Sequence, residues 1–415
     1  MSRQVLKAAG SGLLFTALIG VAMWLARSEE FGRSSAFAWG TGAVFGLALQ
    51  RARFCFFCHT RDWIDTRESS GVLAILLALG IGLLGYHIVV GAWIVDPAAG
   101  YLPPKAHIAP LGIHLAVGGF VFGLGMALSG SCISGHLYRL GEGSMVCLIA
   151  LAAVVPGFMV GFLSWNYLYL HVLATAPVLW LPKPLGFTGA LLIQLSLLAT
   201  VGFLLWRKGT PVARRGDATA SPRTFRASIE KLFIRRWPAW TGGLIVGLLA
   251  AAVLLRAEPL GVTSEIARLA RHLGDWGGLL PARLEGLDTL RGCTLRSSVG
   301  VLSDGTLFLL ALVAASFTGA WTAGDITFEW PGGREIFGAI GGGLLLGWGA
   351  MISLGCTVGT FLSGIHASSL SGWLFGAFLI PGILLGLPAR RWMVRSREAT
   401  RVHRGPLDRS RALME

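Results

Sequence analysis

Three cysteines that follow breaks in apolar segments are the side chains of this sequence best suited to chemistry. Cys132 lies in "SGSCISG", Cys356 in "SLGCTVG" and Cys55 in "RARFCFFCHTRD". A protonated thiol is a weak hydrogen-bond donor, whereas a thiolate is a nucleophile and a metal ligand. Burial in an apolar loop favours the protonated form. We therefore expect these three cysteines to act as neutral, weakly donating groups.

Two further features near these cysteines allow other chemistry. Cys55 and Cys58 form a C-x-x-C pair, which by itself suggests a redox dithiol. No thioredoxin-like pattern surrounds the pair, so we rank thiol exchange second and expect Cys58 to be dispensable. Cys147 lies within an apolar run and is interpreted as a core residue. Three histidines match no zinc spacing, so we expect packing roles and neither a metal site nor a cofactor: His59, His136 and His366.

The composition of the chain indicates the elements that position these residues. Of its 415 residues 54% are hydrophobic and 13% are charged, and the mean hydropathy is +0.66. Apolar runs from Gly71 to Val95 and from Leu185 to Trp206 exceed the roughly 20 residues that span a bilayer. The segment from Gly10 to Ala26 reads as a retained helix, not a cleaved signal peptide. The sequence therefore predicts an all-α polytopic membrane protein.

The net charge of +14 is concentrated in two segments. Arginines and lysines crowd residues 207–236 and the tail 390–415. In a membrane protein such segments are typical cytoplasmic anchors, so we expect no nucleic-acid binding. We predict a multi-pass protein of the bacterial inner membrane with its linker and C-terminus in the cytoplasm.

The chain contains an internal repeat. "GGFVFGLGMALSGSCISG" from Gly118 aligns without gaps to "GGLLLGWGAMISLGCTVG" from Gly342, and glycines, a serine and the cysteine coincide. We predict two homologous, pseudo-symmetric halves, 1–206 and 237–389, joined by the basic linker. Because non-helical backbone inside a membrane must be buried in protein or line a polar cavity, both motifs are predicted to be re-entrant loops with the cysteine at the tip.

The segments long enough to cross the membrane number about nine. Five precede the linker and four follow it, which places the N-terminus opposite the C-terminus, in the periplasm. The segment "WGTGAVFGLALQ" from Trp39 to Gln50 is interpreted as too short to span.

The sequence resembles the YeeE/YedE family of bacterial inner-membrane proteins, in particular its thiosulfate transporter branch. The motifs that carry the resemblance are "FGLALQRARFCFFCHTRD", "GLGMALSGSCISGHLYRLGEGS" and "GWGAMISLGCTVGTFLSGI". The resemblance implies nine transmembrane helices with short re-entrant helices, and uptake of thiosulfate along a path lined by Cys55, Cys132 and Cys356. Cys58 and His59 depart from the family pattern, as does the longer polar stretch from Glu258 to Asp304, which includes Cys293.

Thiosulfate is a dianion with a soft terminal sulfur, to which a neutral thiol can donate weakly. Weak sites in series let an ion both enter and leave. We include Ser131 and Gly355, which precede the repeated cysteines, in the path. Arg53 and Arg61 are expected to attract the anion, as is Arg139, which follows Cys132 by seven residues. Interfacial snorkelling is the alternative role of these arginines.

The predicted protein is thus a transporter and not an enzyme, with thiosulfate or a related sulfur anion and the lipid bilayer as partners. A cytoplasmic sulfur-carrier protein is a further candidate partner. Two alternatives remain: a membrane thiol oxidoreductase, and a transporter of a selenium compound or another sulfur oxyanion. The first requires cysteine pairs within reach of each other.

Overall fold

The computed structural model describes residues 3–99, 101–103, 106–210, 234–256, 260–281, 283–287, 302–328 and 330–403. These residues form helices and no strand. Nine helical stretches among them are long and apolar enough to cross a membrane, as predicted. Cys293 and most of the basic linker lie outside the described residues.

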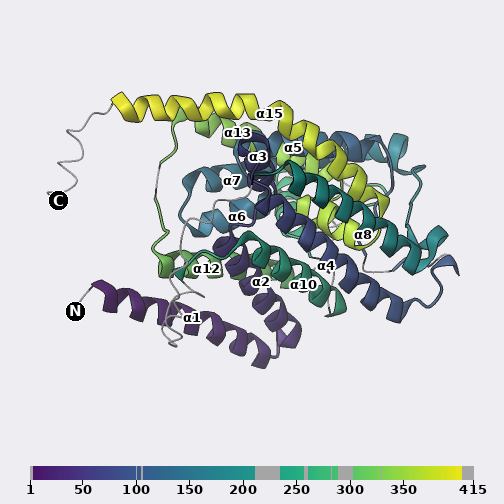
Figure 1. The fold of residues 1–415 in the computed structure, drawn as a ribbon, viewed down its shortest axis with the longest axis horizontal. Coiled ribbons are helices and arrows are strands. Elements are labelled where there is room, and N and C mark those ends of the chain that lie inside the picture. The colour runs from purple at the N-terminus through teal and green to yellow at the C-terminus, as the bar shows by residue number, and fades with distance from the viewer. Residues whose placement is uncertain are drawn as a thin grey trace.

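The helices of the first half are α1 (Arg3–Arg27), α2 (Gly32–Ala52), α3 (Phe56–Thr66), α4 (Ser70–Trp93), α5 (Ile113–Ser129), α6 (Ile133–Gly141), α7 (Met145–Leu168) and α8 (Pro182–Lys208), with short η1 (Pro97–Ala99) and η2 (Tyr169–Leu173). Those of the second half are α10 (Ala239–Arg256), α11 (Ser264–Trp276), α12 (Asp304–Ala323), α13 (Gly333–Ile352), η4 (Thr357–Ser363), α14 (Gly364–His366) and α15 (Leu370–His403). Figure 1 shows the long helices packed into one bundle around the short α3 and α6.

Helix α2 crosses the bundle, although we predicted that its segment is too short to do so. It has 21 residues, about 31 Å at 1.5 Å per residue, which is enough for the hydrocarbon core. Its first turn is polar, and Ser34 and Ser35 donate hydrogen bonds of 2.6 and 2.5 Å to Asp304 of α12. Because α2 packs against α1, α10 and α12, it does not need the apolar surface of a lipid-facing helix.

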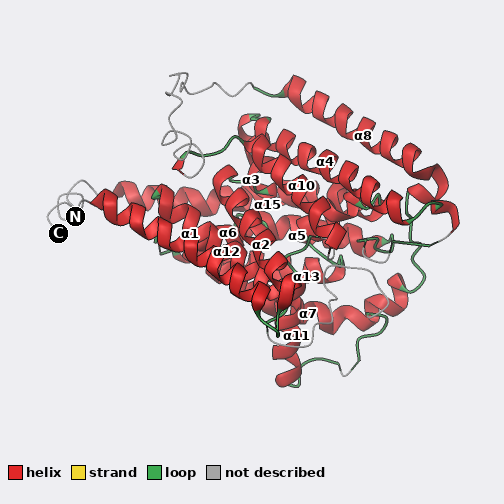
Figure 2. Cartoon of the chain, turned by 90° about the horizontal axis from the view of Figure 1, so that it is seen from below, coloured by secondary structure: helices red, strands yellow, loops and turns green. Residues whose placement is uncertain are grey.

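This extra crossing changes the topology. Helix α1 begins and α15 ends on the same side of the bundle, at the left of Figures 1 and 2. The end of α8 and the beginning of α10, which flank the basic linker, lie towards that side as well. Ends on one side require an even number of crossings, and α2 is the crossing that our prediction omitted. The prediction that the two ends lie on opposite sides is therefore wrong.

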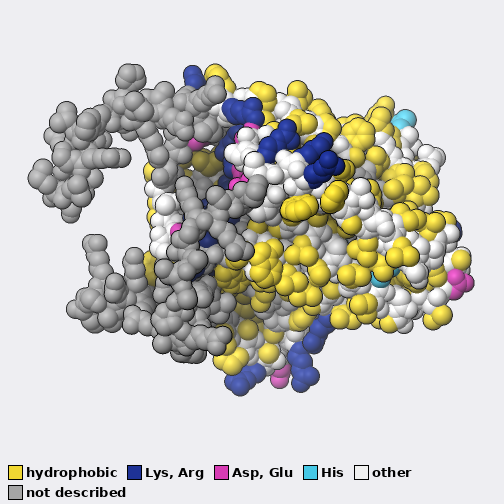
Figure 3. All heavy atoms as spheres, viewed as in Figure 1, with side chains coloured by type: hydrophobic (Ala, Val, Ile, Leu, Met, Phe, Trp, Pro, Cys, Tyr) yellow, Lys and Arg dark blue, Asp and Glu magenta, His cyan; other side chains and the backbone are white. Residues whose placement is uncertain are grey.

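The outer surface is largely apolar. Figure 3 shows hydrophobic side chains over most of the visible face, and most Lys and Arg side chains in view lie towards the side where α1 begins. Large apolar side chains on the crossing helices are exposed, among them Ile88 at 74% and Leu13 at 71%. Water would not solvate such a surface well, but lipid does. The protein is a multi-pass membrane protein, as predicted.

Glycines four residues apart bring the helices into backbone contact in both halves. A Cβ built on Gly119 or Gly123 of α5 would lie 2.6 or 2.2 Å from a carbonyl oxygen of α15. On α13, a Cβ on Gly343 or Gly347 would lie 2.4 or 2.2 Å from a carbonyl oxygen of α7. Only glycine permits such an approach. The same kind of contact is thus made once by each of the two repeated motifs.

Helices α5 and α13 cross antiparallel at the centre of the bundle. A Cβ on Gly118 would lie 2.8 Å from Ser353, and one on Gly342 would lie 2.8 Å from the Ser129 side chain. Each contact joins the early part of one helix to the end of the other. The breaks that follow Ser129 and Ser353 therefore lie at opposite ends of the crossing, about 16 Å apart by the helical rise.

Candidate functional site

Each of the three motif cysteines occupies the N-cap position of a helix. Cys55 precedes α3, Cys132 precedes α6 and Cys356 precedes η4. All three side chains are buried. The first turn of a helix carries backbone N–H groups without helical partners and a partial positive charge. The longer helices α3 and α6 thus direct their positive ends to the place where Cys55 and Cys132 lie.

The structure brings Cys55, Ser131 and Cys132 together from two separate segments. The Cys55 Sγ lies 3.3 Å from Ser131 Oγ and 3.9 Å from Cys132 Sγ. Cys132 Sγ also lies 3.3 Å from Ser134 Oγ in the first turn of α6. We call Cys55, Ser131 and Cys132 the thiol cluster. It combines weak sulfur donors with a hydroxyl in a buried setting.

The absence of a side chain at Gly135 of α6 provides the space that the thiol cluster occupies. A Cβ at this position would lie 2.1 Å from Ser131 Oγ, 3.0 Å from Cys55 Sγ and 3.3 Å from Cys132 Sγ. Any larger side chain would therefore displace the sulfur and oxygen atoms. The glycine that follows the cysteine in "CISG" keeps the cluster compact.

The two breaks share the same internal geometry. Ser129 Oγ donates a hydrogen bond to the Ser131 carbonyl at 3.3 Å, and Ser353 Oγ donates one to the Gly355 carbonyl at 3.1 Å. The residue after each serine is left-handed, with φ of 89° at Gly130 and 61° for a leucine in the second half. Leucine rarely adopts this conformation. The second break therefore holds strained backbone two residues before its cysteine.

Cys356 is separate from the thiol cluster. It follows the break at the other end of the α5–α13 crossing, at the start of η4. An aromatic contact joins the two regions: the rings of Phe56, next to Cys55, and Phe361 of η4 are 6.0 Å apart at an angle of 82°. The three cysteines thus occupy two places along the bundle.

Two of the three arginines that we predicted for anion attraction are paired with carboxylates. Arg53 lies 3.6 Å from Glu142, and Arg61 donates to Asp62 at 2.6 and 2.9 Å. Burial raises the pKa of the Glu142 carboxyl, and the nearby Arg53 opposes this shift. Each pair is largely neutral as a unit, so these arginines attract an anion less than their charges suggest.

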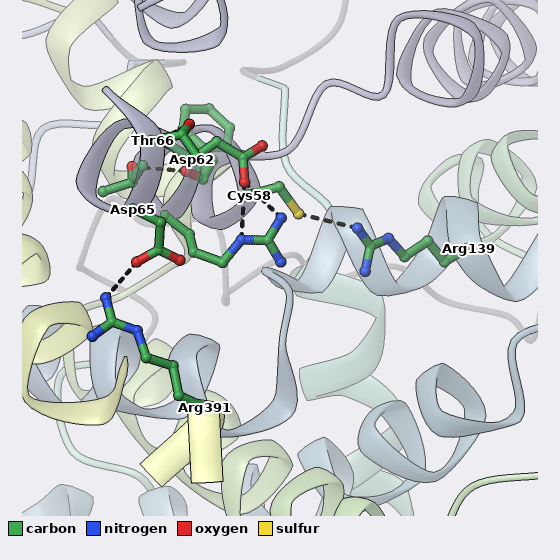
Figure 4. A network of polar contacts seen from close by, with 9 residues as sticks. Cys58, Asp62, Asp65, Thr66, Arg139 and Arg391 are labelled. Carbon is green, nitrogen blue, oxygen red and sulfur yellow. Dashed lines mark hydrogen bonds and ion pairs between the residues drawn. The ribbon is translucent and has the colours of Figure 1, made fainter. Parts of the chain in front are cut away.

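A contact that the sequence did not reveal lies beside the cluster. Arg139 Nη2 of α6 donates a 3.1 Å hydrogen bond to Cys58 Sγ of α3 (Figure 4). The spacing from Cys132 indicated that Arg139 lies near that cysteine, but nothing local pairs it with Cys58. Arg390 of α15 was missed altogether: its guanidinium covers Gly130, where a Cβ would lie 2.3 Å from Nη2. Nothing in the sequence distinguishes Arg390 from the other arginines of the basic tail.

The chain is similar to known transport proteins. A family model described as "Sulphur transport" matches residues 51–385. The chain is 28% identical over 362 residues to the thiosulfate transporter TsuA of Spirochaeta thermophila, covering 82% of this chain and 94% of that protein. It is 25% identical over 378 residues to the thiosulfate transporter TsuA of Escherichia coli, covering 85% and 92%. The probable transporter YedE of Escherichia coli is 26% identical over 200 residues, 47% of this chain and 46% of that protein.

Proposed function

This chain belongs to the sulphur transport family, and from that premise we propose that it carries thiosulfate or a closely related inorganic sulfur anion across the bacterial inner membrane. The relatives named as thiosulfate transporters match most of the length of both chains, which supports this class of substrate. The direction that we propose is import.

The observation that carries the proposal is the thiol cluster at the meeting point of two helix N-termini. Cys55 and Cys132 can each donate S–H to the soft sulfur of thiosulfate, while the Ser131 hydroxyl can donate to an oxygen. The N-termini of α3 and α6 supply positive potential without binding the anion as firmly as a salt bridge does. A dianion bound here would thus contact several weak hydrogen-bond donors instead of one strong donor.

Transport further requires that the anion leaves each site. The thiol cluster and Cys356 lie at opposite ends of the α5–α13 crossing, and the ring of Phe56, next to Cys55, packs against that of Phe361 in η4. We propose two weak thiol sites in series, one at Cys356 and one at the thiol cluster, with the aromatic pair restricting passage. Weak sites in series combine binding with release.

Uptake by the purified protein in proteoliposomes tests this proposal. We expect saturable uptake of labelled thiosulfate, because the anion has the soft sulfur that the thiols recognise. Excess unlabelled thiosulfate should compete fully, whereas sulfate and selenite, which lack a terminal sulfur, should compete weakly. Absence of uptake, or equal competition by sulfate, would contradict the proposed recognition by thiols.

Thiol exchange is the second candidate function, and one distance favours it. The Sγ atoms of Cys55 and Cys132 are 3.9 Å apart, so a small movement would allow a disulfide. Such an enzyme needs an external oxidant or thiol partner. Family membership supports transport over this alternative.

We further propose that the side where α1 begins and α15 ends is cytoplasmic, because the basic segments 207–236 and 390–415 flank it. Reporters of topology fused to the N-terminus and to the C-terminus should therefore both report the cytoplasm. Signals from opposite sides would exclude the crossing by α2, whereas periplasmic signals from both ends would reverse the proposed orientation. The thiol cluster lies towards this side, where a cytoplasmic sulfur-carrier protein is our proposed acceptor.

A further inference from the structure

Cys58 and Arg139 continue the two helices that begin at the thiol cluster. Cys58 lies one turn into α3 after Cys55, and Arg139 lies about two turns into α6 after Cys132. Their side chains meet at 3.1 Å (Figure 4). The two helices therefore converge twice, first at the thiol cluster and then at this sulfur–guanidinium contact.

Arg139 has no carboxylate partner among the described residues. Its polar contacts are Cys58 Sγ and the Tyr138 hydroxyl, which accepts from Nε at 3.3 Å. The guanidinium also lies 5.9 Å from the centre of the Tyr138 ring. These partners are neutral or weakly polar, so they leave the positive charge of Arg139 uncompensated.

Arg390 adds a second cation of the same kind. Its Nη1 donates to the Leu128 carbonyl at 3.3 Å, and its guanidinium covers Gly130, two residues before Cys132. No carboxylate forms an ion pair with it in the part of the chain that the structure describes. Arg390 is repelled electrostatically by Arg139 and by Arg61. The Glu335 carboxylate, which forms no ion pair with Arg390, attracts it less strongly than these two arginines repel it. Two like charges held in a partly buried place are costly unless an anion joins them.

Neighbouring arginines show the contrast. Arg53 faces Glu142, and Arg61 is bound to Asp62. Figure 4 shows that Arg391 is bound to Asp65. Among the described residues, carboxylates pair with these neighbouring arginines, but none contacts Arg139 or Arg390. An incoming anion would supply the missing negative charge.

We propose that Arg139 and Arg390, with the Cys58 thiol that holds Arg139, form a second anion site next to the thiol cluster. It binds a small divalent sulfur oxyanion through the oxygen atoms. The inference rests on the proposed function and extends it: the thiols of the cluster recognise the soft sulfur, and the two guanidinium groups recognise the oxygens. Several N–H donors on each guanidinium suit a sulfonate group.

Binding of labelled sulfate to the purified full-length protein tests this site, because sulfate has the oxygens of thiosulfate without its soft sulfur. We expect saturable binding at one site per chain that weakens with added salt. Arg139→Gln and Arg390→Gln should each weaken it about tenfold, since each removes a charge-assisted contact. Arg139→Lys, which keeps the charge, should lose less than Arg139→Gln.

Arg391→Gln is the matched control, because Arg391 is the neighbour of Arg390 in sequence and already binds Asp65. It should leave sulfate binding unchanged. Absence of sulfate binding by the monodisperse wild-type protein would overturn the inference, as would equal weakening in Arg391→Gln. Failure of thiosulfate uptake with sulfate binding intact would instead refute the transport proposal alone.

Discussion

Replacing Cys132 or Cys356 by alanine is expected to lower thiosulfate uptake in proteoliposomes about ten- to hundredfold. Each change removes the thiol at one of the two breaks, and a hydrogen bond to a charged ligand is worth about 1.5–3 kcal/mol. Both cysteines are N-caps whose side chains make no capping hydrogen bond. The helices should therefore form without the thiols, and the loss should be one of transport and not of folding.

Cys147→Ala is the matched control for these two variants. Cys147 is also a buried free cysteine, but it lies in α7 and outside the thiol cluster. The Cys147→Ala variant should keep uptake within about twofold of the wild type, because the change removes no group of the thiol cluster and alanine suits a helix. Size-exclusion profiles in detergent would establish that all three variants fold. If the Cys132 and Cys356 variants kept normal uptake while the Cys147 variant lost it, the proposed role of the cysteines at the two breaks would be refuted.

Cys55→Ser is expected to reduce uptake about tenfold, whereas Cys58→Ser should keep most of it. Cys55 lies within the thiol cluster, and its sulfur contacts both Ser131 and Cys132. Serine at position 58 retains an oxygen that can accept the hydrogen bond from Arg139, so the guanidinium stays in place. The measurement is the initial rate of labelled thiosulfate uptake by each variant under reducing conditions.

Repeating that comparison under oxidising conditions separates transport from thiol exchange. A C-x-x-C dithiol loses its exchange chemistry when either sulfur is removed. Equal loss of activity in Cys55→Ser and Cys58→Ser, together with an oxidant sensitivity that disappears in both, would favour the oxidoreductase. Sensitivity that disappears in Cys55→Ser but persists in Cys58→Ser would identify the Cys55–Cys132 contact as the reactive pair.

The crossing by helix α2 could not be predicted from the local sequence alone. The segment Trp39–Gln50 was interpreted as too short to cross, yet the helix extends over Gly32–Ala52, and Ser34 and Ser35 in its polar first turn bind Asp304 of α12. Hydropathy measures the preference of a segment for lipid, but a helix enclosed by other helices is solvated by protein. The error in the predicted position of the N-terminus follows from this one element.

The sequence by itself determined the membrane class, the repeat and the three cysteines at helix breaks, because apolar length, small-residue spacing and loop composition are local properties of a chain. Only the tertiary structure decided which groups meet. Cys55 contacts Cys132, Arg139 contacts Cys58 and Arg390 covers Gly130, and each contact joins segments that are far apart in sequence. Such pairs depend on how helices cross and on close glycine contacts between them, and no single segment specifies that geometry.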